Sequence, residues 1–244
     1  MKLLPLVSTL CVVGASAAFA QPAGGTMRDA QRGQPWRESF QVDLKELTTE
    51  GENPYFILKP GYQLTLEGKE SGKTVQLVIT VLQETMNVGG VNTRVVEERE
   101  THGGVVVEVS RNYFAIHPRT NDVYYFGEEV DIYKNGKLDG HEGAWRHGSN
   151  NARFGLIMPG KPAVGMRFYQ EHAPKVALDR AEVVSLTERS TTPGGVFEQC
   201  VKMKETTPLE RFTTEYKVYA PGVGLIEEGA LKLVSHKFVQ NPPR

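Results

Sequence analysis

From Asn53 onward, the sequence alternates between segments rich in β-branched and aromatic residues and short turns. Each segment is bounded by Gly, Pro, Asn or Asp, which is typical of strands joined by tight connections. No long stretch repeats apolar residues every 3.6 positions, so long amphipathic helices are not predicted. Short connections favour antiparallel pairing, because parallel strands need long crossovers. The predicted strands are 64–67, 74–85, 91–100, 105–116, 123–133, 153–158, 165–172, 177–189, 195–206, 212–219 and 224–238.

Two local signals refine this pattern. Asn135-Gly136 lies between two predicted strands and is typical of a two-residue hairpin turn. Residues 38–50 precede the strands, and we expect at most one short helix there.

An internal repeat constrains how the strands assemble. Residues 78–100 align without a gap with residues 183–205, at an offset of 105, and six of 23 positions are identical. We interpret this as a duplicated β-meander with copies near 54–130 and 159–229, joined by a connecting hairpin at 131–158. Each copy alone is a small sheet with one apolar face, so the copies are predicted to share one core within a single domain at 51–238. The predicted fold is therefore all-β: a curved antiparallel sheet, half-barrel or sandwich-like.

The N-terminal residues have the pattern of an export signal. Lys2 precedes the apolar run Leu3 to Val13, and Ala18-Phe19-Ala20 places small residues where a signal peptidase cuts. We expect cleavage after Ala20 and a periplasmic or extracellular location. Residues 21–50 are predicted to be a linker and 239–244 a tail. No later stretch approaches 18 apolar residues, so no transmembrane segment is predicted in the mature chain.

Charge and cysteine content exclude some classes of activity. The chain has 28 Lys and Arg and 29 Asp and Glu, and loss of the signal removes only one lysine. This near-neutral charge balance excludes electrostatic binding of nucleic acid as the main activity. Cys200 is the one cysteine of the mature chain, and the first repeat copy has Val95 at the matching position. The Val/Cys exchange indicates a small buried apolar slot.

Several motifs resemble a known group of proteins. The segments are Asn53-Pro-Tyr-Phe-Ile-Leu-Lys-Pro-Gly61, Thr192-Pro-Gly-Gly-Val-Phe-Glu-Gln-Cys-Val-Lys202 and Tyr219-Ala-Pro-Gly-Val-Gly-Leu-Ile226. Together they resemble a family of exported bacterial all-β proteins without assigned activity, over most of residues 53–235. The resemblance implies a half-barrel sheet related in shape to periplasmic lipoprotein carriers. It implies hydrophobic-ligand binding only by analogy, and it supplies no catalytic residues.

Aromatic residues crowd the middle of the chain. Tyr124 and Phe126 are expected to share one face of a strand, while Tyr125 lies on the other. Core packing explains such a cluster, because aromatics dominate cores. The alternative is a surface that lines a ligand groove or faces a partner. The candidate ligand-binding residues are Tyr113, Tyr124, Phe126, Tyr133 and Trp145.

A polar loop at 139–151 suggests metal binding as an alternative. His141, Glu142 and His147 supply ligand types that suit copper or zinc. The spacing is not that of a zinc-protease helix, and the competing interpretation is an exposed loop with Trp145 packed onto the sheet.

Enzyme motifs are absent from the sequence. It contains no Gly-x-Ser-x-Gly and no Cys-x-x-Cys. Carboxylates cluster at 97–100 and 128–131, but sequence alone cannot separate a hydrolase site from a solvated face. We therefore predict a non-catalytic exported binding module without cofactor, for an apolar or lipid-like molecule or an envelope protein partner. Metal binding and an unrecognised hydrolase remain the alternatives.

Overall fold

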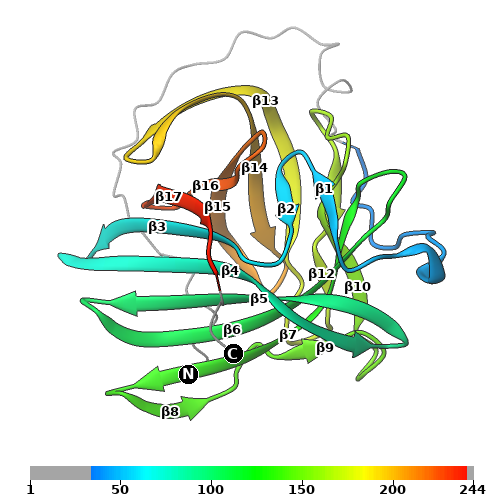
Figure 1. Ribbon diagram of the computed structural model, residues 1–244. Coiled ribbons are helices and arrows are strands. Elements are labelled where there is room, and N and C mark those ends of the chain that lie inside the picture. Colours follow the sequence, from blue (N-terminus) through cyan, green and yellow to red (C-terminus); the bar gives the residue numbers. More distant parts are fainter. Residues whose placement is uncertain (1–33, 241–244) are drawn as a thin grey trace, which may run out of the picture.

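The computed structural model describes residues 34–240, and it is dominated by one large curved sheet (Figure 1). The predicted signal segment, the first part of the predicted linker and the last four residues lie outside the described residues. Within 38–50, the expected helix is reduced to a single 3-10 turn, η1 (Leu44–Glu46). Asp43 precedes it and accepts a hydrogen bond from the Lys45 backbone N–H at 3.0 Å. No helix long and apolar enough to cross a membrane occurs within 34–240.

Seventeen strands follow this turn within residues 34–240. The first seven are β1 (Gly51–Asn53), β2 (Phe56–Leu58), β3 (Tyr62–Glu70), β4 (Lys73–Val88), β5 (Val91–His102), β6 (Val105–Ile116) and β7 (Val123–Lys134). The middle ones are β8 (Lys137–Gly140), β9 (Trp145–Arg146), β10 (Arg153–Met158), β11 (Arg167–Tyr169) and β12 (Glu171–His172). The last are β13 (Arg180–Thr192), β14 (Gly195–Thr207), β15 (Glu210–Ala220), β16 (Gly224–Glu228) and β17 (Leu231–Phe238).

All strands except β1 and β2 belong to one antiparallel sheet, which confirms the predicted fold class. Its order is β11-β13-β14-β15-β16-β17-β3-β4-β5-β6-β7-β10-β12, with β8 and β9 paired to β7. The two edge strands, β11 and β12, are consecutive along the chain and separated only by Gln170. The sheet therefore bends until its two edges are joined through one residue, although it does not close into a barrel.

Most predicted strands match the observed ones, and two differ. The predicted strand 224–238 is wrong, because the chain turns at Gly229, whose φ of +54° suits glycine, and so β16 and β17 are separate. The predicted strand 165–172 is divided at Gln170 between the two edges of the sheet. The Asn135-Gly136 turn is confirmed by the pairing of Lys134 with Lys137.

The curvature has a local origin in irregular strand pairing. The register shifts between Val81 and Thr85 in the β4–β5 pair and between Asn112 and Phe114 in the β6–β7 pair. Such bulges bend a strand and increase its twist. The β4–β5 and β13–β14 segments of the proposed repeat both form long antiparallel hairpins.

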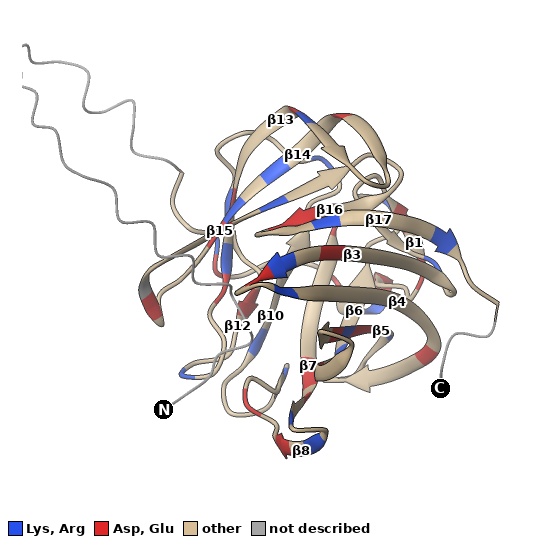
Figure 2. Ribbon diagram, turned by 90° about the vertical axis from the view of Figure 1, so that its left-hand side faces the viewer, with Lys and Arg blue, Asp and Glu red and all other residues tan. Residues whose placement is uncertain are grey.

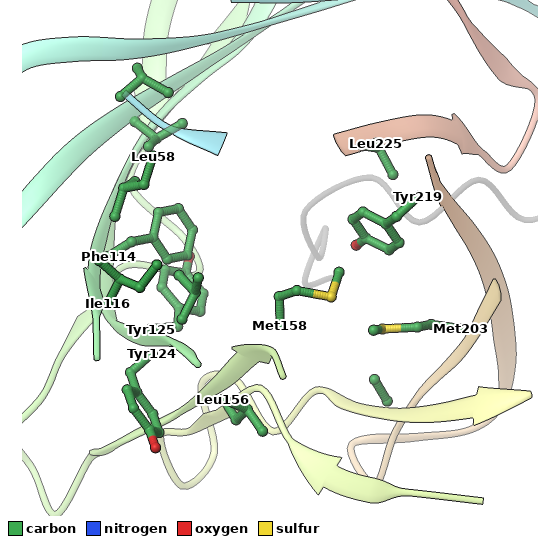
Figure 3. Packing of buried hydrophobic residues seen from close by; sticks show 14 of the residues in the cluster. Leu58, Phe114, Ile116, Tyr124, Tyr125, Leu156, Met158, Met203, Tyr219 and Leu225 are labelled. Carbon is green, nitrogen blue, oxygen red and sulfur yellow. The ribbon is translucent and has the colours of Figure 1, made fainter. Parts of the chain in front are cut away.

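Bending brings the two walls of the sheet to face each other across a common interior. Figure 3 shows Phe114 and Tyr125 on one side, Tyr219 and Met203 on the other, and Met158 between them. Cys200 and Val95, which occupy equivalent positions of the proposed repeat, are both buried, as predicted.

Candidate ligand cavity

The concave side of the sheet contains a cavity of about 200 Å³. Residues from both walls of the sheet line it. Residues from the seam, the stretch around Gln170 where the two sheet edges meet, also line it. Its ten acidic lining residues are Glu70, Glu98, Glu100, Glu108, Glu128, Glu171, Asp179, Glu205, Glu215 and Glu228. Acidic positions (red) recur on β5, β7, β12 and β16 in Figure 2. Among the lining residues that the structure describes, Lys217 is the single Lys or Arg.

Strand alternation explains why these side chains point inward. Successive side chains of a strand point to opposite faces, so residues two apart share a face. On β6, Glu108, Ser110 and Asn112 follow this spacing, and all three line the cavity. Glu98 and Glu100 do the same on β5. The polar faces of β5 and β6 thus line the cavity on the concave side of the sheet.

Two pairs of carboxylates lie directly opposite each other across neighbouring strands. Glu100 pairs in register with Glu108 on β5 and β6, and Glu205 pairs with Glu215 on β14 and β15. Like charges in such positions destabilise a sheet. The interior therefore has an unfavourable arrangement of negative charge in the absence of a bound cation or proton.

Lys217 offsets part of this charge. Its Nζ lies 3.2 Å from Glu205 Oε2 and 2.9 Å from Glu228 Oε1. Burial alone would lower the pKa of Lys217, but the neighbouring carboxylates outweigh it and hold that pKa well above its usual value. Gln170 Nε2 donates to the other oxygen of Glu205 at 2.8 Å. The Lys217 ammonium group thus forms ion pairs with two of the ten carboxyl groups.

Several of the other carboxyl groups have pKa values above the usual value. Burial, followed by the charge of Glu228, raises the pKa of Glu98 to about 7. Burial and the facing Glu100 raise the pKa of Glu108 to about 7. Burial raises the pKa of Glu128 to about 8, although a hydrogen bond with Tyr125 opposes the shift. Near neutral pH the cavity therefore holds a mixture of protonated and ionised acids.

Glu171 lies at the seam and is the most enclosed of these acids, with only 6% of its surface exposed. Its carboxyl group interacts with the side chains of Trp145 and Asp179. Burial, and then Asp179 and Glu128, raise the pKa of Glu171 well above its usual value.

An apolar cavity of about 90 Å³ adjoins the acidic one. Glu98, Phe114, Ile157, Lys217 and Glu228 line both spaces. The β1–β2 hairpin covers the apolar end, and its Phe56 ring lies edge-on to Phe114 at 5.0 Å between centroids. The other apolar lining residues include Tyr55, Ile57, Ile79, Val81, Tyr219 and Leu225.

The structure places the predicted aromatic residues outside these two spaces. Tyr124 and Phe126 pack against Phe154, with centroids at 5.7 and 4.9 Å. Their strand neighbour Tyr125 faces the cavity instead, together with Phe114.

The other three candidates also lie elsewhere. Tyr113 is buried beneath the Arg146 guanidinium, 5.6 Å from the ring centroid. Trp145 is buried edge-on to Tyr125 and interacts with the Glu171 carboxyl group. Tyr133 is half-buried. None of the five lines the acidic or the apolar space.

The histidines of the 139–151 loop are occupied by local contacts. His141 Nδ1 lies 2.8 Å from the Val130 carbonyl and 2.9 Å from Asp131 Oδ1. His147 packs against Phe126 and Phe154, and burial lowers its pKa. Across residues 34–240, no group of three His, Cys, Asp or Glu side chains is placed to hold a metal ion. The geometry thus gives the metal prediction no support.

Sequence reasoning missed the acidic interior, although signals for it exist. The spacing Glu108-x-Ser110-x-Asn112 puts three polar groups on one strand face. Glu100 and Glu205 are also one of the six identical pairs of the repeat, and both line the cavity.

Searches of protein-family models, curated proteins and solved structures found no match to this chain. The family resemblance of the motifs therefore stays a prediction.

Proposed function

We propose that this chain is an exported, non-catalytic binding module that holds a small amphipathic molecule inside its curved sheet. The observation that carries the proposal is a pair of adjoining cavities with different chemistry, one acidic and one apolar, which share five lining residues. Binding sites of small molecules are usually concave, largely apolar and equipped with a few convergent polar groups. The two halves of the sheet, which we propose arose by duplication, each contribute one wall.

Two possible nucleophiles of the described chain, Cys200 and Lys217, are not activated for covalent catalysis. Burial raises the pKa of the Cys200 thiol to about 11, so a thiolate is not formed at neutral pH. Lys217 is held as a cation by Glu205 and Glu228, and a protonated amine is not a nucleophile.

Native mass spectrometry of protein purified from an exporting host tests the proposal. We expect wild-type protein to carry a non-covalent small-molecule adduct. Ile79→Phe should lose the adduct, because Ile79 lines the apolar end and a larger ring would fill it. Val196→Phe is the matched control, since Val196 is a 57% exposed strand residue away from the cavity. Absence of an adduct in the wild type, or its retention in Ile79→Phe, would contradict the proposal.

A second candidate, a hydrolase, is favoured by one specific observation. The cavity contains Glu128, with a pKa near 8, together with carboxylates that are paired with Lys217. Acids whose environments differ in this way serve as general acid and general base in hydrolases. A panel of nitrophenyl glycosides and esters tests this candidate. Turnover that Glu128→Gln abolishes would support it, and no turnover of any substrate would contradict it.

A further inference from the structure

We infer that a second pocket, separate from the two cavities of the proposed function, binds a small organic phosphate. This basic pocket measures about 360 Å³ and shares no lining residue with the acidic or the apolar cavity. The inference stands on three features of the pocket: its excess of cationic side chains, a buried guanidinium nitrogen without a partner, and a framework of fixed backbone segments.

The lining of the basic pocket is rich in cations. They come from the N-terminal segment, the turn between β6 and β7, the loop after β10, and β11, and they are Arg37, Arg119, Lys161 and Arg167. Asp122 is the single Asp or Glu among the described lining residues. Both of its oxygens already accept hydrogen bonds, from the Gly160 N–H at 2.8 Å and from the Thr120 hydroxyl at 2.9 Å.

Neighbouring acids balance only half of these cations. Glu46 pairs with Arg119 at 2.5 Å, and Glu182 pairs with Arg167 at 3.0 Å. Among residues 34–240, no Asp or Glu forms an ion pair with Arg37 or Lys161. The pocket therefore favours an anion, because like charges that converge on one space repel until a counter-charge is bound.

An independent observation points to a missing acceptor. The Nε of Arg167 is buried and has no hydrogen-bond partner among residues 34–240, although Nη2 of the same side chain donates to Glu182. A buried donor of a charged group without a partner is costly, because its desolvation is uncompensated. Since Arg167 lines the pocket, a bound oxyanion can accept from this nitrogen. Arginine is also the side chain whose fork best matches phosphate.

The backbone segments that carry the four cations are fixed in the free protein. Asn53 is fully buried, and its Nδ2 donates at 2.8 Å to a carbonyl of the turn that carries Arg119 and at 3.1 Å to one of the loop that carries Lys161. On the other side, the Arg37 N–H donates to the Arg167 carbonyl at 3.0 Å. A site held in place before binding loses less conformational freedom when the ligand enters.

The rest of the lining defines the class of anion. Leu156, Met166 and Phe168 supply an apolar wall, which suits a ligand with an organic group. A phosphate monoester has three terminal oxygens and close to two negative charges near neutral pH, whereas a carboxylate has two oxygens and one charge. Cations on several separate segments can therefore contact a phosphate at the same time more readily than a carboxylate.

Titration calorimetry of protein without residues 1–20, in phosphate-free buffer at pH 7.5, tests the inference. The probes are phenyl phosphate, inorganic phosphate, benzoate and phenol. We expect phenyl phosphate to bind about tenfold more tightly than inorganic phosphate or benzoate, and phenol not to bind. Lys161→Gln and Arg37→Gln should each weaken phenyl phosphate binding about tenfold, the loss expected for one charge-assisted hydrogen bond.

Matched controls separate the pocket from general charge effects. Lys137→Gln and Arg189→Gln remove exposed cations of the same two types outside the pocket and should leave the affinity unchanged. Because Lys161 forms no ion pair, its substitution should preserve the fold, which circular dichroism checks. Sedimentation with phosphatidylcholine vesicles that contain phosphatidic acid distinguishes a lipid headgroup from a small molecule.

Several outcomes would overturn the inference. Inorganic phosphate or benzoate that binds as tightly as phenyl phosphate would remove the assignment of an organic phosphate. Failure of all four probes would contradict the site, as would phenyl phosphate binding that is equal in the wild type and in both pocket variants. Vesicle binding that Lys161→Gln abolishes, without phenyl phosphate binding, would assign the pocket to a lipid surface. Phenyl phosphate binding that Ile79→Phe abolishes would place the ligand in the apolar cavity instead.

Discussion

At the scale of single residues, ionisable carboxyl groups in the interior lower the stability of the folded protein. Glu98, Glu108 and Glu128 are carboxyl groups placed where burial and like-charged neighbours oppose ionisation. Natural cores rarely retain such groups unless they have a function, because an apolar or neutral replacement removes the cost. The same logic applies to Cys200, where burial suppresses the thiolate and makes the residue a packing element.

Replacement of one cavity acid by its neutral isostere is expected to stabilise the free protein. Glu108 has a pKa of about 7, so at pH 8 its ionised form faces Glu100 across the strands. We expect Glu108→Gln to raise Tm by several degrees at pH 8 and by less at pH 5.5, given about 2–4 °C per kcal/mol in a domain of this size. Scanning calorimetry measures this, with Glu198→Gln as the control. A lowered Tm at both pH values would contradict the expectation.

Cys200 is expected to be unreactive in the folded protein. Its thiol is fully buried and has a pKa of about 11, whereas exposed thiols ionise near pH 8.5. In protein without residues 1–20, a thiol reagent at pH 8 should modify less than one tenth of the chains in an hour. Complete modification should follow in 6 M guanidinium. Rapid labelling without denaturant would show that the β14 region opens.

At the scale of elements, the seam between the two sheet edges is the critical structure. β10 packs against the chain that runs from β11 to β12, and Gly155 lies at this contact. A Cβ on Gly155 would lie 2.6 Å from the Tyr169 carbonyl oxygen and still closer to the Gln170 carbonyl. These are backbone atoms, so they cannot move aside as a flexible side chain would. Glycine at this position therefore permits the edges to meet.

Substitution at the seam tests this role. We expect Gly155→Ala to lower the free energy of unfolding by about 2–3 kcal/mol, through steric displacement of the Gln170 backbone. Gly72→Ala is the comparison, since Gly72 has a φ of +80° but no neighbour within 4 Å. That change should cost about 1 kcal/mol from conformation alone. Urea denaturation measures both, and an equal loss in the two variants would argue against a tight seam.

At the scale of the whole molecule, the cavity acids set the pH dependence of stability. The native pKa values of Glu98, Glu108 and Glu215 are about 7 and that of Glu128 is about 8, whereas the usual value is 4.5. Between pH 4.5 and 8 the folded protein therefore binds more protons than the unfolded chain. Proton linkage then requires the free energy of unfolding to fall as pH rises through this window.

The resulting expectation is a Tm that is higher at pH 5 than at pH 8. Scanning calorimetry in buffers of equal ionic strength measures it. A Tm that is constant or rises between pH 5 and pH 8 would contradict these raised pKa values.

Local sequence signals determined the strands of this protein. Turn residues and β-branched runs predicted most boundaries, including the Asn135-Gly136 hairpin, because these preferences depend on neighbouring residues. Alternation also placed Tyr124 and Phe126 on the face opposite Tyr125. Only the tertiary structure decided which face is enclosed, because that depends on the closure at Gln170, far along the chain from Glu100. The same closure places Glu100 and Glu205 in one cavity, where buried carboxylates behave unlike those of a solvated sheet face.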